Sequence, residues 1–179
     1  MNYADMTLEQ LMDIPVYAAS KRDQKTSEAP SSVTLITAQE IQAYGWRTLG
    51  DLLRSTPGFY VSNPRTYGFL GVRGFGRPGD FGGRILMLVD GHRMNDPLYD
   101  TAAILEDFIL DVDLIDRVEV VRGPGSALYG NNAFFAVVNI VLKRGGQIGG
   151  VEVDGEAGTY GTYRGRLTYG TLTDRKSVV

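Results

Sequence analysis

The sequence has no cysteine and a single histidine, His92, among its 179 residues. Disulfides, thiolate metal sites and cysteine nucleophiles are therefore excluded together. A metal site would have to be built from carboxylates with at most one imidazole, and no loop has the ligand spacing of a hard-cation site. We expect no metal site and no cofactor, and a structural or solvent-facing role for His92.

The sequence also lacks a basic excess and a long apolar run. Lys and Arg total 18 against 21 Asp and Glu, a net charge of -3, which leaves no electrostatic footprint for nucleic acid. No apolar run is long enough to cross a bilayer as a helix, and the N-terminus lacks the basic start and apolar block of a signal peptide. If the protein is exported, we expect its signal peptide to lie outside this sequence.

Catalytic motifs are missing as well. No G-x-S-x-G nucleophile elbow occurs, and the acids near Asp96 and Asp100 have no fixed spacing that defines a catalytic pair. Residues 74–79 formally match G-x-G-x-x-G, but Pro78 leaves no helix whose N-terminus could hold a pyrophosphate. A nucleotide-dependent enzyme rests on this match alone, so we expect no catalytic residues and no enzyme.

What the sequence does have is glycine, 23 residues beside 10 tyrosines, which indicates many tight turns. β-branched or apolar stretches predict strands at 32–37, 59–62, 69–75, 84–91, 118–123 and 137–144. Capping signals predict short helices after Thr37 and Thr48, and an Asp-led helical piece near 111–117. Strands interleaved with short helices indicate an α+β fold with a small mixed sheet.

Composition divides the chain into three parts. We predict a flexible leader over residues 1–27, a compact domain over 28–146 and a different all-strand region over 147–179. In the last region, 151–157 and 163–169 alternate apolar or aromatic with polar residues. This pattern is typical of a transmembrane β-barrel hairpin, and an ordinary surface hairpin has the same pattern.

Six stretches taken in order resemble the plug domain of a TonB-dependent outer-membrane receptor. They read APSSVTLITAQEI, TLGDLLRSTPGFYV, GVRGF, ILMLVDGHRMND, VEVVRGPGSALYG and VVNIVLKR. The resemblance covers about residues 13–144 as plug, and the rest is similar to the first barrel hairpin. It implies a Gram-negative outer-membrane transporter for a scarce nutrient such as a ferric siderophore or cobalamin, with the plug inside the barrel.

The resemblance also implies plug contacts with the barrel. Arg73 and Arg122 match plug arginines that pair with glutamates on the barrel wall, where a bidentate carboxylate partner is most effective. One departure is visible: where the family commonly has a glycine pair before the last plug strand, this chain has Phe135-Ala136.

Residues 13–20, DIPVYAAS, resemble the short segment that such receptors present to the periplasmic protein TonB. The implied contact residues are Asp13, Ile14, Pro15, Val16, Tyr17 and Ala18. Pairing would be strand addition, in which main-chain hydrogen bonds supply affinity, although Pro15 lacks a donor. The alternative is that this stretch is the extended end of a disordered leader.

Three loops mix aromatic and charged residues: SNPRTYG, GRPGDFGG and GHRMNDPLYDTA. In the family the outward plug loops help to form the substrate site. The implied ligand contacts are Arg65, Tyr67, Arg77, Phe81, Arg93 and Tyr99. Aromatic faces and arginines suit an anionic metal chelate, whereas solvated turns have the same composition. A soluble periplasmic or surface interaction domain with a plug-like fold is the alternative function.

Overall fold

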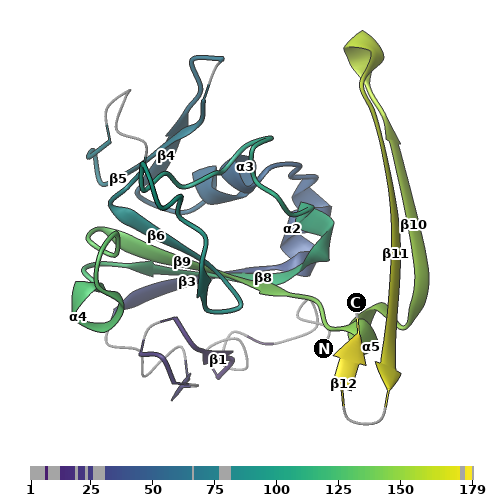
Figure 1. Cartoon of the computed structure of the whole chain (residues 1–179), viewed down its shortest axis with the longest axis horizontal. Helices are drawn as coiled ribbons and strands as arrows, with labels where there is room; N and C mark the ends of the chain where they lie inside the picture. The colour runs from purple at the N-terminus through teal and green to yellow at the C-terminus, as the bar shows by residue number, and fades with distance from the viewer. Residues whose placement is uncertain are drawn as a thin grey trace. The chain divides into compact units, whose positions relative to one another are not determined.

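The computed structural model describes residues 7, 13–18, 20–22, 24–25, 31–65, 67–76, 82–173 and 176–178. The chain divides into two compact units, Met1–Leu142 and Lys143–Val179. Figure 1 draws the two units with their helices and strands labelled. Each unit has a sheet of its own.

The first unit is built on a five-stranded sheet in the order β3-β8-β9-β6-β7. Its strands are β3 (Ser32–Thr37), β8 (Ile115–Arg122), β9 (Ala136–Leu142), β6 (Ile85–Val89) and β7 (His92–Arg93). Strands β6 and β9 pair in parallel, and the other neighbours are antiparallel. The sheet is therefore mixed, as predicted. Four of the five residues of β6 are buried, which confirms a strand covered on both faces.

Two short helices begin at the predicted caps. Helix α2 (Ala38–Tyr44) starts after Thr37, whose hydroxyl accepts a hydrogen bond from the Glu40 amide at 3.3 Å while the Glu40 carboxylate accepts from the Thr37 amide at 2.8 Å. It ends at Gly45, which takes a left-handed φ of 65°. Helix α3 (Leu49–Arg54) starts in the same way after Thr48. Both capping predictions are confirmed.

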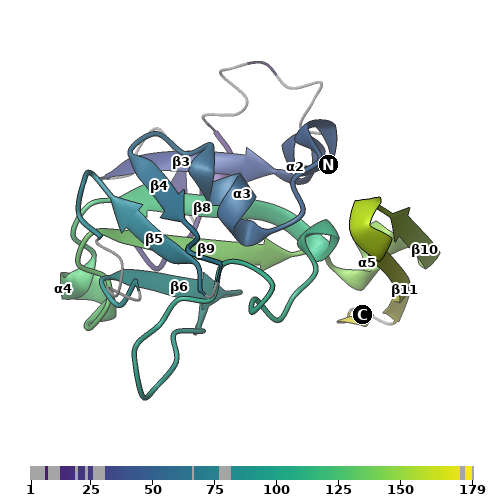
Figure 2. The same cartoon turned by 90° about the horizontal axis from the view of Figure 1, so that it is seen from above.

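One face of the sheet carries the main core. Figures 1 and 2 show α2, α3 and the hairpin of β4 (Phe59–Ser62) and β5 (Phe69–Val72) lying over this face. Leu49, Leu52 and Leu53 of α3 are fully buried against the sheet residues that point the same way. The helical piece predicted near 111–117 is shorter than expected: η3 (Val112–Leu114) is capped by Asp111, and β8 already begins at Ile115.

The opposite face carries a smaller apolar cluster and the start of the chain. The cluster consists of Ala18, Leu86, Leu88, Val121, Ala133 and Val137, with Val33 and Tyr129 packed beside it. Strand β1 (Pro15–Val16) pairs with β2 (Gln24–Lys25) on this side of the sheet (Figure 1). The short helix α4 (Ser126–Tyr129) lies at the edge of the cluster.

The start of the chain differs from the expected flexible leader. The described residues Ile14, Val16 and Ala18 are buried, whereas Asp13, Pro15 and Tyr17 point outward. This alternation is the period of a strand lying on an apolar surface. The sequence did not reveal this alternation, because the start of the chain is mostly polar and only three apolar residues follow the alternation.

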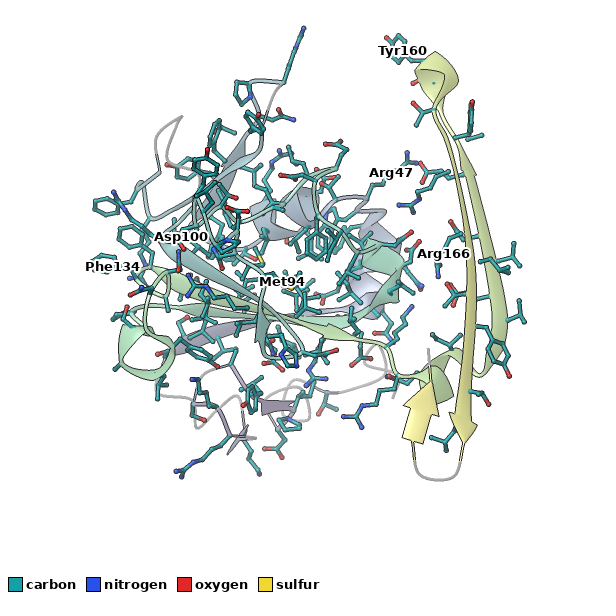
Figure 3. All side chains as sticks on the ribbon, viewed as in Figure 1. Arg47, Met94, Asp100, Phe134, Tyr160 and Arg166 are labelled. Atoms are coloured by element: carbon teal, nitrogen blue, oxygen red, sulfur yellow. The ribbon has the colours of Figure 1, made fainter. Side chains whose placement is uncertain are left out.

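The second unit is an antiparallel hairpin with a short third strand. It contains α5 (Gly145–Ile148), β10 (Gly150–Ala157), η4 (Thr159–Gly161), β11 (Tyr163–Thr173) and β12 (Lys176–Val178). Figure 3 shows Tyr160 at the tip of this hairpin, where its side chain is fully exposed.

The two faces of the hairpin differ in polarity. Val151, Val153 and Leu167 are exposed on one face. On the other face Arg166 binds Glu152 at 2.6 Å. The predicted fold class, a small mixed sheet with short helices followed by a β-hairpin, is confirmed. The structure places the division between the units after Leu142, close to the boundary predicted from composition.

Candidate functional site

The predicted TonB contact lies on the face of the sheet opposite to the main core. Its buried residues, Ile14, Val16 and Ala18, are at most 5% exposed, and Tyr17 is 38% exposed. Asp13 pairs with Lys25 across the β1–β2 ladder at 2.9 Å. The segment formed by residues 13–18 therefore has a short strand, Pro15–Val16, at its centre and packs on the domain through alternate side chains.

The 13–18 segment is also bound through its main chain. The amides of Tyr17 and Ala18 donate to one carboxylate oxygen of Glu119, Oε2, at 3.1 and 3.0 Å. Glu119 lies in the middle of β8 and is 0% exposed. A carboxylate in an apolar sheet face requires partners, and two of its partners come from the start of the chain.

Three further groups fix the Glu119 carboxylate. Arg117 donates to the other oxygen, Oε1, from Nε at 3.1 Å and from a terminal nitrogen at 3.0 Å. The Asn139 amide donates to Oε2 at 3.3 Å and accepts from the Gly91 amide at 3.1 Å. Asn139 lies directly opposite Glu119 in the β8–β9 ladder. Each carboxylate oxygen therefore has its own partners: Arg117 binds Oε1, whereas the 13–18 segment and Asn139 bind Oε2.

Tyr129, in α4, forms the border of this site. Burial, followed by the charges of Tyr17 and Glu119, raises the pKa of Tyr129 from 10.0 to about 12. Its hydroxyl is buried without a hydrogen-bond partner, and the Lys21 ammonium lies 4.6 Å from the centre of its ring. The neutral phenol is therefore the favoured form beside the 13–18 segment.

An open cavity of about 670 Å³ lies at the end of the sheet near α4. It is lined by Gly83, Arg84, Asp100, Ser126, Gly130, Asn131, Asn132 and Phe134. Figure 3 shows Asp100 and Phe134 at the same end of the first unit as α4. Arg93 reaches the cavity wall by donating to Asp100 at 2.9 Å and to Asn132. Charge, amides and an exposed ring thus surround one concave surface.

The predicted ligand residues are placed unequally around this cavity. Arg93 contacts two of its lining residues, whereas Arg65, Tyr67 and Tyr99 are not among them. Tyr67 and Tyr99 have exposed rings in neighbouring loops. Arg77 and Phe81 lie outside the described residues. Among the predicted residues that the structure describes, Arg93 is the one with a hydrogen bond to residues that line the cavity.

The two predicted barrel contacts differ in burial. Arg122 ends β8, where it donates to the Pro57 carbonyl at 3.2 Å and to the Ser32 hydroxyl at 2.7 Å. Its Nε is buried without a hydrogen-bond partner. Arg73 is exposed and takes a positive φ of 52°. Within the described part of the chain, no carboxylate pairs with Arg122.

Phe135 and Ala136, which depart from the family's glycine pair, are accommodated without a gap. Ala136 begins β9 and is fully buried. The Phe135 ring stacks on Phe75 at 5.1 Å and contacts Phe134 edge to face at 4.9 Å. The larger side chain therefore adds an aromatic cluster beside the cavity instead of disturbing the strand.

Sequence reasoning missed the polar residues inside the apolar strands. Glu119 and Asn139 interrupt VEVV and VVNIVL at positions that point toward the same face. Two polar residues in nearly continuous apolar strands are a signal that can be read from sequence alone. The cavity residues Asp100 and Asn132 gave no comparable signal, because their loops meet only in the folded chain.

The described residues contain neither a cluster of metal ligands nor a membrane-spanning helix. No group of three or more His, Asp or Glu side chains is placed to hold a metal ion in those ranges. Nor does any helix there combine the length and apolarity needed to span a membrane. His92 lies exposed on β7.

The family model described as the TonB-dependent Receptor Plug Domain matches residues 25–137, more than half of the chain. The chain belongs to this plug family. The match includes strands β3, β6, β7 and β8, the residues that line the cavity and the buried Glu119, and it ends near the start of β9. The predicted family is therefore confirmed.

Curated relatives of this plug are transport and iron-related proteins. The chain is 35% identical over 135 residues to the vitamin B12 transporter BtuB of Vibrio vulnificus, covering 74% of this chain and 21% of the relative. It is 31% identical over 133 residues to an iron-regulated outer membrane virulence protein of Vibrio cholerae, covering 72% and 20%. The plug chain therefore spans about a fifth of the length of these relatives.

The plug fold is also found in solved receptor structures. The structure of FpvA of P. aeruginosa bound to a heterologous pyoverdine matches with a TM-score of 0.70 at 23% identity, covering 96% of this chain and 22% of that one. This likeness shows the fold. The relatives are transporters and receptors rather than enzymes, by their names.

Proposed function

We propose that this plug belongs to a TonB-dependent outer-membrane transporter that binds a scarce nutrient and gates its energy-dependent uptake. The nutrient class, a ferric siderophore, cobalamin or a similar molecule, is supported by the vitamin B12 transporter and the iron-regulated protein among its relatives. The observation that carries the proposal is the 13–18 segment. Its residues Pro15–Val16 form a short strand, its alternate side chains lie buried on the plug, and strand addition uses a strand of this kind.

The ligand side of the proposal rests on the cavity near α4. Arg84, Asp100 and the exposed Phe134 ring line it, and Arg93 contacts its wall. We propose that Arg93 contacts ligand there, together with the neighbouring loop residues Arg65, Tyr67, Arg77, Phe81 and Tyr99. Arginines bind anionic groups and aromatic rings cover apolar faces, which suits a metal chelate as cargo.

The periplasmic side rests on the 13–18 segment. Strand addition by the C-terminal domain of TonB would use main-chain groups of Val16, Tyr17 and Ala18, while Asp13, Ile14 and Pro15 complete the contact. Force applied through this segment would then displace or partly unfold the plug, which opens the path for the nutrient. The leader faces the periplasm in this arrangement.

The barrel side rests on the hairpin and on two arginines. Exposed Val151, Val153 and Leu167 form the apolar face that a barrel strand presents to lipid. Such a face disfavours a soluble interaction domain, because large exposed apolar patches associate in water. Arg122 and Arg73 would pair with carboxylates on the barrel wall, as the family resemblance implies for both.

The test is a calorimetric titration of the chain with the C-terminal domain of TonB. We expect saturable binding by the natural sequence and its loss in Val16→Pro, because proline removes a main-chain donor from the strand-forming position. Pro15→Ala is the matched control: it adds a donor next to the same position, so binding should persist.

A synthetic peptide of residues 13–20 completes the design. Binding of the peptide alone, with none by the folded chain, would mean that the segment is the contact but is not accessible. Failure of both the chain and the peptide to bind TonB would contradict the proposed contact.

A further inference from the structure

The 13–18 segment and Glu119 satisfy each other. The segment brings two amide donors that would otherwise lie against an apolar surface, and Glu119 brings a fully buried carboxylate that needs donors. The two partners are 101 and 102 residues apart in sequence. This contact therefore fixes the start of the chain to the centre of the sheet.

The orientation of the carboxylate is set before the segment arrives. Arg117 holds Oε1 through two nitrogens at 3.1 and 3.0 Å, and Asn139 approaches Oε2 from the neighbouring strand. Asn139 is itself held by the Gly91 amide. Oε2 is thus presented toward the Tyr17 and Ala18 amides by groups that belong to the sheet.

We propose that Glu119 is a latch that keeps the 13–18 segment on the plug and competes directly with TonB for its main chain. This inference rests on the proposed function, because it assumes that TonB binds the segment. Strand addition uses main-chain amides, and the Tyr17 and Ala18 amides are already occupied by Glu119. The segment must leave Glu119 before a partner strand can use those two donors. Glu119 is in this sense a positioning residue, because it sets the fraction of molecules whose 13–18 segment is released and can bind TonB.

The latch is tested by amide hydrogen exchange on the whole chain, without TonB. In the natural sequence the Tyr17 and Ala18 amides should be protected. Glu119→Gln removes the negative charge and replaces one acceptor oxygen by an NH2 group, which cannot accept a hydrogen bond from the segment. We therefore expect the Tyr17 and Ala18 amides to exchange about tenfold faster or more. Glu152→Gln is the matched control, since it makes the same change in a carboxylate that binds Arg166 at 2.6 Å within the second unit. Its exchange at Tyr17 and Ala18 should stay unchanged.

A second variant keeps the test valid if Glu119→Gln fails to fold. Tyr17→Pro removes one latch donor from the segment and changes no residue of the sheet. The Ala18 amide should then exchange faster, although it keeps its own bond to Glu119. Natural exchange rates of both amides in Glu119→Gln, and of the Ala18 amide in Tyr17→Pro, would overturn the latch.

The TonB titration separates the latch from the proposed function. If Glu119 acts as a latch, the Glu119→Gln chain should bind the TonB domain about tenfold more tightly than the natural chain. The reason is that the segment is held on the sheet in fewer molecules of the variant. Faster exchange with unchanged TonB affinity would overturn the competition. Faster exchange with no TonB binding by the chain, the variant or the 13–20 peptide would leave Glu119 holding the segment but overturn both the proposed function and the competition.

Discussion

Single residues on the face opposite to the main core determine how the start of the chain is held. Glu119 and Asn139 face each other across two central strands, and the residues next to each of them along its strand are apolar. A slip of one strand by one residue would turn its polar side chain into the main core and separate it from its partner on the other strand. The pair therefore specifies the register of β8 and β9 as well as the site for the 13–18 segment.

Tyr129 offers a test at the scale of one hydroxyl. Its pKa is raised from 10.0 to about 12, mainly by burial, so the folded chain binds this proton more strongly than the unfolded chain. The resulting stabilisation is complete below pH 10 and is lost as the pH rises toward 12. In Tyr129→Phe we expect the free energy of unfolding to fall less steeply across this range, as measured by urea denaturation at successive pH values.

At neutral pH the same variant should be as stable as the natural chain, or more stable by up to about 1 kcal/mol, because the hydroxyl is buried without a partner. Tyr44→Phe, on an exposed ring, is the control and should keep the natural pH dependence. A pH profile of Tyr129→Phe that coincides with that of the natural chain would contradict the assigned cause.

At the scale of elements, the two helices over the main core are set by local rules. Both begin after a threonine whose hydroxyl accepts the amide three residues on, and α2 adds a returning glutamate. Helix α3 is then tied to a distant loop, since the Gly50 amide donates to the Ile104 carbonyl. A β-carbon on Gly50 would lie 3.1 Å from the Ile104 carbonyl oxygen, so the close approach of the two backbones favours glycine.

Removal of the α2 cap should be measurable. Thr37→Ala deletes the hydroxyl that accepts the Glu40 amide and also loses its bond to the Glu40 carboxylate at 2.9 Å. We expect the free energy of unfolding to fall by about 1 kcal/mol in urea denaturation. Thr37→Ser keeps the hydroxyl and should retain most of that stability. Equal losses in the two variants would assign the effect to the methyl group and not to the cap.

These elements also show what a sequence can reveal. Helix caps, the β-branched strands and the alternating hairpin depend on neighbours within a few residues, so they could be predicted. The contact between Ala18 and Glu119 spans 101 residues and depends on the completed sheet, so no local pattern encodes it. The same holds for the cavity, where Arg93 meets Asn132 across 39 residues. The only sign in the sequence of the contact between Ala18 and Glu119 is that Glu119 and Asn139 are polar residues within apolar stretches.

At the scale of the whole first unit, the two faces of the sheet are covered in different ways. The main core is covered by helices and a hairpin of the central sequence, whereas the smaller cluster is covered in part by Ala18 from the start of the chain. One face thus has a permanent cover, and the other has a cover that can leave if the 13–18 segment is withdrawn.

A chain beginning at Ser31 tests this asymmetry. It lacks Ala18, so Leu86, Leu88 and Val137 should be more exposed and should bind a fluorescent apolar dye. We expect the free energy of unfolding to fall by about 1–3 kcal/mol, because buried Val16 and Ile14 are also lost. Circular dichroism establishes that the shortened chain is folded. Natural dye binding and natural stability in a folded, shortened chain would contradict the role of the segment as a cover.

Glu119 holds main-chain amides, and this has a consequence for how the protein can evolve. An anchor that recognises the backbone makes few demands on the side chains that point away from it. Asp13, Pro15 and Tyr17 point outward, so substitutions there can retune the choice of partner while the anchorage stays the same. The outward residues can therefore change independently of the inward ones, because Ile14, Val16 and Ala18 must continue to fit the sheet.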